Sequence, residues 1–308
     1  MMLRVKSCCV ILLLLGMSSN TWSQDLEPRR WSRLPVGTNF IGLAANDSVG
    51  DIYFDPVLQN KDVSLNYAAL GASYIRTFGL FGKLARVDLN APYVSGHWEG
   101  LHQGVRRSLR LRGFTDPRIR FSINLWGAPA LKGREFGQFM ATHPINTTVG
   151  AAVAIYPPLG EYRSDKLINL GSNRWTLRPQ LGVLHEHNKW QFETTAAAFV
   201  YFDNDEFFPG KSTLKEDPLW SVQVHAIHTF RPGLWASAGA AYAWGGESNI
   251  NGIENDDKSQ IVIWGVSVGV PINHMQGLKF AYARSLTQTD LGSDLNTFQI
   301  AWTLMMGS

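Results

Sequence analysis

The sequence predicts an all-β protein, a transmembrane antiparallel up-and-down β-barrel of about 12 strands with short turns at one end and long loops at the other. Three observations predict it: a composition poor in charge, segments with a large apolar residue at every second position, and connections that alternate between short and long. Charged residues make up 17% of the 308-residue chain, which also contains 11 Trp and 29 Gly. That composition favours strands and turns over helices.

The N-terminus has the layout of a secretory signal peptide. Arg4 and Lys6 precede an apolar run that starts at Cys8 and ends at Met17, and a small, mostly polar exit follows up to Ser23. The run is too short to cross a bilayer as a helix, which takes about 20 residues. We therefore expect residues 1–23 to be removed and residues 24–308 to form one barrel domain.

Removal of this segment restricts the chemistry of the remaining chain. Both cysteines of the sequence, Cys8 and Cys9, leave with it, so neither a disulfide nor a catalytic thiol is expected. The remaining chain carries 26 basic and 25 acidic residues. A balance this close to neutral gives no reason to expect nucleic-acid binding.

The last strand, 298–306, shows the alternating pattern most clearly. Its large apolar residues occupy every second position and therefore share one face of an extended segment, which something apolar must cover. Repeats of this kind predict twelve strands, at 38–45, 66–78, 86–93, 118–125, 149–155, 175–183, 190–202, 220–230, 234–244, 262–272, 278–286 and 298–306.

The connections between these segments alternate in length, as they do in an outer-membrane barrel. The long ones are 46–64, 94–112, 157–174, 203–217 and 245–258. Segment 127–145 is a long connection on the short-turn side, and we expect a small helix at 131–140 within it. Because an open sheet edge in lipid would leave backbone groups unpaired, the last strand should pair with the first.

Tryptophan positions fit two aromatic girdles at the membrane surfaces. Trp190 and Trp235 follow short turns, while other tryptophans lie near long loops: Trp175, Trp220, Trp244 and Trp264. A β-sandwich with these residues in its core is the alternative. Its strands would more often be 5 or 6 residues long.

Short motifs are spread over the chain after residue 23: RWSRLPVGTNF at 30–40, FDP at 54–56, GFTDP at 113–117, NLWGAPAL at 124–131 and RPGLW at 231–235. In combination they resemble the outer-membrane transporters named for the meta-cleavage pathway of phenol degradation. The resemblance implies a bacterial outer-membrane β-barrel that passes small, often aromatic or hydrophobic, molecules. It supplies no set of substrate-binding residues. The chain departs from barrels in general by ending on Met306-Gly307-Ser308 rather than on an aromatic residue.

The faces opposite the apolar ones should look into the barrel, because Arg or Lys facing lipid at the midplane costs about 2–4 kcal/mol. Polar and charged candidates on these faces are Arg86, Asp88, Arg118, Arg120, Arg178, Gln180, Gln191, Glu193, Gln223 and His225. We expect these side chains to form a structural network that fills and rigidifies a narrow lumen. A constriction that selects polar or anionic solutes by its excess of arginine is the alternative, and the two roles are compatible.

No catalytic site, cofactor or metal site is expected. Ser221 and His225 share a strand face but lie about 13 Å apart, too far for a nucleophile and its base. The two histidines of 185–187 fall at a tight turn, where solvated side chains are the simpler interpretation than a metal site. The acidic residues of 203–206 and 256–257 are likewise expected to be solvated.

The sequence therefore predicts a passive outer-membrane channel for small organic molecules. The expected partners are outer-membrane lipid, lipopolysaccharide, the barrel-insertion machinery and a small-molecule solute. A structural, adhesive or enzymatic barrel, or a secreted β-sandwich, is the alternative. The transported solute, the oligomeric state, and whether the lumen is open or plugged stay undecided by the sequence.

Overall fold

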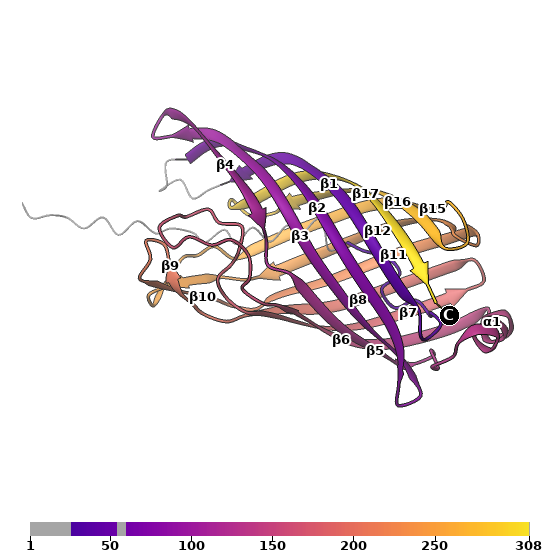
Figure 1. The fold of residues 1–308 in the computed structure, drawn as a ribbon. Helices are drawn as coiled ribbons and strands as arrows, with labels where there is room; N and C mark the ends of the chain where they lie inside the picture. Colours follow the sequence, from indigo (N-terminus) through magenta and orange to yellow (C-terminus); the bar gives the residue numbers. More distant parts are fainter. Residues whose placement is uncertain (1–25, 54–59, 308) are drawn as a thin grey trace, which may run out of the picture.

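The computed structural model describes residues 26–53 and 60–307, so the expected signal peptide lies outside the described residues. Within these ranges, twelve strands close into an antiparallel barrel (Figure 1). They are β1 (Asn39–Tyr53), β2 (Asn60–Leu80), β3 (Lys83–His102), β5 (Arg118–Trp126), β6 (Ile145–Tyr156), β7 (Thr176–His187), β8 (Trp190–Tyr201), β11 (Leu219–Arg231), β12 (Leu234–Gly245), β15 (Ser259–Pro271), β16 (Gln276–Thr287) and β17 (Gly292–Met306). Each predicted strand corresponds to one of these. The predicted barrel is confirmed, and the β-sandwich alternative is wrong.

The barrel closes between its first and last strands, as predicted. In the β1–β17 ladder Asn39 lies opposite Met306 and Ala45 lies opposite Ile300. The other edge of β1 pairs with β2, which in turn pairs with β3. Because the ladder is continuous around the barrel, its backbone N–H and C=O groups are satisfied without water, which a lipid environment requires.

Side chains alternate across the wall with the expected period of two. On β17, Phe298 is 56% exposed and Ile300 is 45% exposed, whereas Thr297 is buried. On β15, Val266 is exposed and Ser267 is buried against Ser237 of β12. The apolar positions therefore form the outer surface, where lipid covers them, and the small and polar positions face the lumen.

The long-loop end is more ordered than the sequence predicts. Strand β1 continues to Tyr53, and β4 (Val105–Phe114) pairs with the end of β3 from Tyr93 to His102. The interpretation of 46–64 and 94–112 as loops is therefore wrong for most of their described length. Four short strands, β9 (Asn204–Phe207), β10 (Ser212–Glu216), β13 (Ser248–Ile250) and β14 (Ile253–Glu254), join two further loops into a small sheet. It lies at the opposite end from α1 and the C-terminus (Figure 1).

The small helix expected at 131–140 is present as α1, which spans Gly133–Thr142 at the short-turn end and so begins and ends two residues later than predicted. None of its residues is buried, so α1 does not fill the lumen. Within the described residues, no helix is long and apolar enough to cross a membrane.

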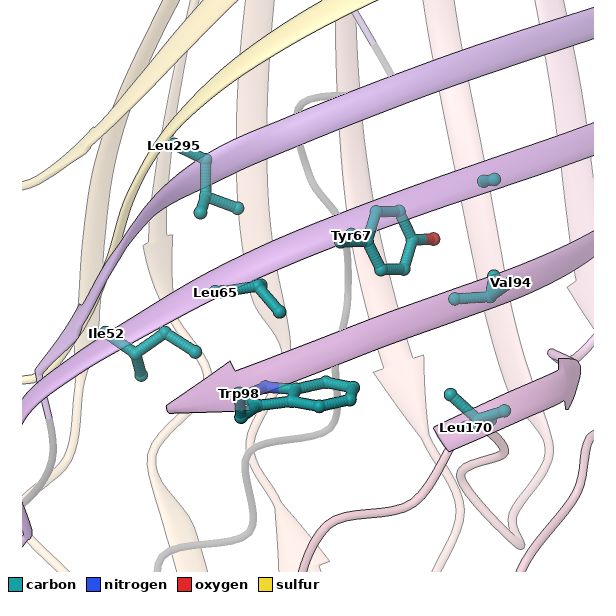
Figure 2. Close-up of a cluster of buried hydrophobic side chains, with 8 residues drawn as sticks. Ile52, Leu65, Tyr67, Val94, Trp98, Leu170 and Leu295 are labelled. Atoms are coloured by element: carbon teal, nitrogen blue, oxygen red, sulfur yellow. The ribbon is translucent and has the colours of Figure 1, made fainter. Parts of the chain in front are cut away.

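The inner surface near the long loops is apolar (Figure 2). Figure 2 shows Tyr67 of β2, Trp98 of β3 and Leu295 of β17 turned toward the same interior space. The cluster is Ile52, Leu65, Tyr67, Ala69, Val94, Trp98, Leu170 and Leu295. Its members come from four strands and from one loop, so the cluster holds the loop against the wall as an ordinary buried core would.

Trp235 is not part of the predicted girdle. It is on the same face of β12 as the buried Ser237 and Ala243, and the Arg29 guanidinium lies 5.4 Å from its ring. Its ring also packs over Gly269 of β15. Trp190 and the tryptophans near the long loops at 175, 220, 244 and 264 are each at least 39% exposed on the outer face.

Candidate functional site: the lumen and the inner segment

Residues 26–37, here called the inner segment, lie inside the barrel. The backbone N–H of Val36 donates to the Leu131 carbonyl at 2.8 Å, and that of Gly37 donates to the Thr77 carbonyl at 2.9 Å. These bonds tie the segment to the rim at the short-turn end. From there the chain runs back into the lumen, where Trp31 is completely buried. The lumen of this structure is therefore occupied by the protein's own N-terminal residues.

Glu193 on β8 holds the middle of the inner segment. Its carboxylate oxygens accept the backbone N–H groups of Arg30 at 3.1 Å and Trp31 at 3.3 Å. Glu193 is 1% exposed. A buried carboxylate that accepts two N–H groups satisfies donors that an irregular segment cannot satisfy within itself.

An ion pair holds the segment nearer the rim. Arg33 Nε lies 2.5 Å from a carboxylate oxygen of Glu186 on β7, and both side chains are at most 5% exposed. Arg33 also donates to the His143 carbonyl at 3.2 Å, just after α1. Gln191 donates to Glu186 at 3.0 Å and so supports the pair from β8. The expectation that 185–187 is simply a solvated turn is wrong for Glu186, whose side chain points into the lumen.

A chain of polar contacts runs along the inner face of the wall from β3 to β7. Arg86 Nη2 donates to Asp88 at 2.6 Å, and Arg120 Nη1 donates to the same carboxylate at 3.2 Å. Arg120 Nε then donates to Gln180 at 2.7 Å. Strand β6, between them, presents the small residue Ala154, which leaves room for these long side chains.

The other candidates from the sequence also lie on the lumen side. Arg178 is buried with its guanidinium carbon 4.3 Å from the centre of the Phe199 ring. Gln223 and His225 are buried and lie 3.1 Å apart. Arg118 lines the cavity described next. The structure thus brings Arg86, Asp88 and Arg120 into direct contact and places Glu193 against the inner segment, while Gln223 and His225 lie apart from that network.

A cavity of about 500 Å³ occupies the lumen beside the inner segment. Charged lining comes from Glu27 of the segment, Arg86 and Arg118 of the wall, and Lys279 of β16. Apolar lining comes from other residues, including Ala69 and Leu170, which also belong to the apolar cluster near the long loops. A space of this size suits a small organic molecule.

The loops that cover the opposite end contain a buried ion pair. Arg174 pairs with Glu216 of β10, and its guanidinium lies 4.3 Å from the ring of Tyr201. Burial raises the pKa of the Glu216 carboxyl, and the charge of Arg174 acts in the opposite direction. Asp116 accepts the backbone N–H groups of Gly160 and Ser172, each at 2.8 Å. These contacts hold the loops together at that end of the barrel.

Lumen residues that the sequence did not single out as candidates are Trp31, Glu186, Lys279 and the inner segment as a whole. Trp31 belongs to a quoted motif, but its hydrogen-bond partners on the barrel wall are 93–164 residues away in the chain. The alternating pattern indicates that Lys279 faces inward, because its neighbours Leu278 and Phe280 belong to the outward-facing apolar positions of that strand. No local pattern indicates where the inner segment goes.

The comparisons with known proteins agree with this fold. A model of the family described as "Putative MetA-pathway of phenol degradation" matches residues 46–293. No curated protein sequence matches the chain. The chain is similar to an outer membrane channel from Pseudomonas putida F1, with 19% identity, a TM-score of 0.75 and coverage of 92% of this chain and 100% of that one. A weaker likeness is to the transport unit of the autotransporter AIDA-I from Escherichia coli, with 8% identity, a TM-score of 0.48 and coverage of 92% and 95%. The first likeness shows a shared barrel fold, and the second is too weak to support an argument.

Proposed function

The chain belongs to the family described as "Putative MetA-pathway of phenol degradation", and from that membership we propose that it is a passive channel for small organic molecules in the bacterial outer membrane. The family suggested by the short motifs is thereby confirmed. The outer surface of the barrel is suited to lipid, and the termini of the barrel lie at the short-turn end, which faces the periplasm in outer-membrane barrels.

The lumen cavity is the observation that supports this proposal most strongly. It lies inside a closed wall, it has about 500 Å³ of space, and its lining combines apolar residues with charged ones. A solute with an apolar body and a polar group finds both kinds of contact there. The apolar cluster that joins the cavity near Ala69 and Leu170 extends the favourable surface toward the long loops.

Solute flux into proteoliposomes tests the channel directly. We expect vesicles that contain the protein to swell in small organic solutes faster than protein-free vesicles, at rates that fall as solute size increases. Because the inner segment fills part of the lumen, a Trp31→Ala variant is measured beside the unaltered protein. If neither protein passes any solute, although unheated samples migrate as folded barrels on detergent gels, the channel function is refuted.

Charge in the lumen should set the preference of the channel for anions. The basic side chains there, Arg30, Arg33, Arg86, Arg118, Arg120, Arg178 and Lys279, outnumber the acidic ones, Glu27, Asp88, Glu186 and Glu193. We expect Arg118→Ala to lower the ratio of anion to cation permeability several-fold, as measured by the reversal potential in a salt gradient. Arg120→Ala would be less informative, because its loss would also remove the donor to Gln180 and one of the two arginines that hold Asp88.

Arg110→Ala provides the matched control, because Arg110 is an exposed arginine on β4, outside the lumen. Its removal should leave the reversal potential unchanged. An unchanged reversal potential in Arg118→Ala as well would restrict the lumen arginines to a structural role.

We further propose how this chain is exported and inserted into the membrane. Residues 1–23 act as the signal peptide, residues 24–308 form the barrel domain, and the barrel-insertion machinery places it in a membrane whose outer surface carries lipopolysaccharide. The charged and apolar layout of residues 1–23 supports the first assignment, and the alternating strands and apolar outer face support the others. Mass analysis of the purified protein tests the first of them, since a mature N-terminus at Gln24 is expected.

A further inference from the structure

The wall of the barrel contains a slot shaped to one aromatic ring. Gly150 of β6 and Gly182 of β7 lie directly opposite each other in the ladder. A side chain at either position would collide with the indole of Trp31, which lies flat over both glycines. Two facing glycines on the lumen side of adjacent strands remove the side chains that would otherwise cover the backbone, and so form a flat floor.

The remaining walls of the slot supply specific chemistry. Thr195 Oγ of β8 accepts the indole N–H at 2.8 Å. The Arg120 guanidinium of β5 lies 5.0 Å from the ring centre, within the range of a cation–π contact. The ring itself is 0% exposed. The slot therefore recognises a planar aromatic ring with one hydrogen-bond donor at its edge.

All four groups that form the slot belong to the barrel wall, on β5, β6, β7 and β8. None is supplied by the inner segment. The slot therefore keeps its floor, its hydrogen-bond acceptor and its cation when the indole is absent. By contrast, the inner segment contains no helix or strand, and its place in the lumen depends on side-chain contacts and a few backbone hydrogen bonds.

The inner segment lies alongside the cavity inside the lumen. Glu27 and Pro28 line the cavity, while Val36 and Gly37 are bonded at the rim. The cavity also reaches residues next to the short turns, among them Gly233 and Leu278, so it extends to that end of the barrel beside the segment. Asp88 lines the cavity and accepts a hydrogen bond from Arg120 of the slot, so the slot is next to the solute's path.

We propose that this slot is a binding site for small planar aromatic solutes that carry an N–H or O–H donor, and that the indole of Trp31 is an internal competitor for it. The proposal rests on the proposed channel function. A solute that takes the place of the indole releases a completely buried side-chain anchor of the inner segment and so widens the space beside the segment on the way to the periplasm. The channel is then widened by the class of molecule that it passes.

Free indole is the natural probe, because it reproduces the side chain that the slot holds. In detergent, the full-length Trp31→Ala protein should bind about one equivalent of indole by isothermal titration calorimetry. Adding Gly182→Ala, which places a methyl group in the slot, should weaken this binding by about tenfold or more. Thr195→Val should reduce the preference for indole over naphthalene, which has no donor.

The matched control is Trp31→Ala combined with Gly137→Ala. Gly137 is on α1, outside the lumen, and a side chain added there would meet no atom within 4 Å, so a methyl group fits. This variant should bind indole as Trp31→Ala does. Absence of indole binding in a correctly folded Trp31→Ala protein, or equal binding in the Gly182→Ala variant, overturns the proposed site.

Displacement is tested in the protein that keeps Trp31. A nitroxide attached to Pro28→Cys, in a chain with no other cysteine after Cys9, reports the mobility of the inner segment. Indole should increase that mobility and cyclohexanol, which is not planar, should not. An immobile label at saturating indole overturns the competition. Neither measurement depends on flux, so failure of the channel function in proteoliposomes is detected separately.

Discussion

Glu193→Ala is expected to release the inner segment and raise the conductance of the channel several-fold in planar bilayers. The carboxylate is the buried acceptor for the Arg30 and Trp31 backbone N–H groups. Its loss leaves those two donors buried without a partner and removes a negative charge from a region rich in arginine. Removing one member of a buried charged network costs about 3–5 kcal/mol, more than an irregular segment can offset.

Proteolysis provides a second measurement of the same release. The inner segment contains Arg29, Arg30 and Arg33, which trypsin can cleave only when they leave the lumen. The Glu193→Ala protein in detergent should lose its N-terminus to trypsin quickly, while the unaltered protein resists.

Two variants separate the role of Glu193 from a general loss of stability. Glu193→Gln keeps an oxygen acceptor but loses the charge, so its conductance should lie between those of the unaltered protein and Glu193→Ala. Thr194→Ala changes the adjacent, outward-facing residue and should behave as the unaltered protein. Equal conductance and equal trypsin resistance in all four proteins would show that Glu193 does not hold the segment.

Most of the barrel could be predicted from the sequence because its strands carry a local signal. A strand in lipid must be apolar on one face, so residues such as Phe298 and Ile300 alternate with residues such as Gln299. The same parity places Arg86, Asp88 and Arg120 in the lumen. It also shows that Trp235 faces inward with Ser237, although its nearness to a turn suggested a girdle.

The alternation rule holds only where lipid covers the wall. Beyond the membrane, toward the long loops, the interior is filled by Leu65, Tyr67, Val94 and Trp98 packed under Leu170 (Figure 2). At that level apolar residues face inward because a loop packs against the inner side of the wall. The ends of β1 and β3 therefore look like loops when they are judged by a pattern that applies to the membrane.

The inner segment could not be predicted because its position is fixed by distant contacts. Trp31 meets Thr195, which is 164 residues away. The facing glycines of β6 and β7 are a partial sign, since glycine in a strand interior often marks a close approach of another group. Without the register between these strands, however, the sequence does not reveal that Gly150 and Gly182 lie side by side, or which ring covers them.

The second large effect is expected from Val266→Arg, which tests the orientation of the wall. Val266 lies near the middle of β15 and is 49% exposed on the outer face. An arginine there must lie in the hydrocarbon core of the membrane. The free energy of unfolding from lipid vesicles, measured by denaturant titration, should fall by about 2–4 kcal/mol.

Ile272→Arg is the matched comparison, because Ile272 follows the end of β15, has the same parity and is 53% exposed at the short-turn end. An arginine at that level can reach the interface, so the loss there should be about 0–1 kcal/mol. Equal losses at the two positions would contradict the depth that the barrel assigns to them. A small loss at Val266 alone would mean that this face is not covered by lipid, because water or protein around the side chain would remove the cost of burying its charge.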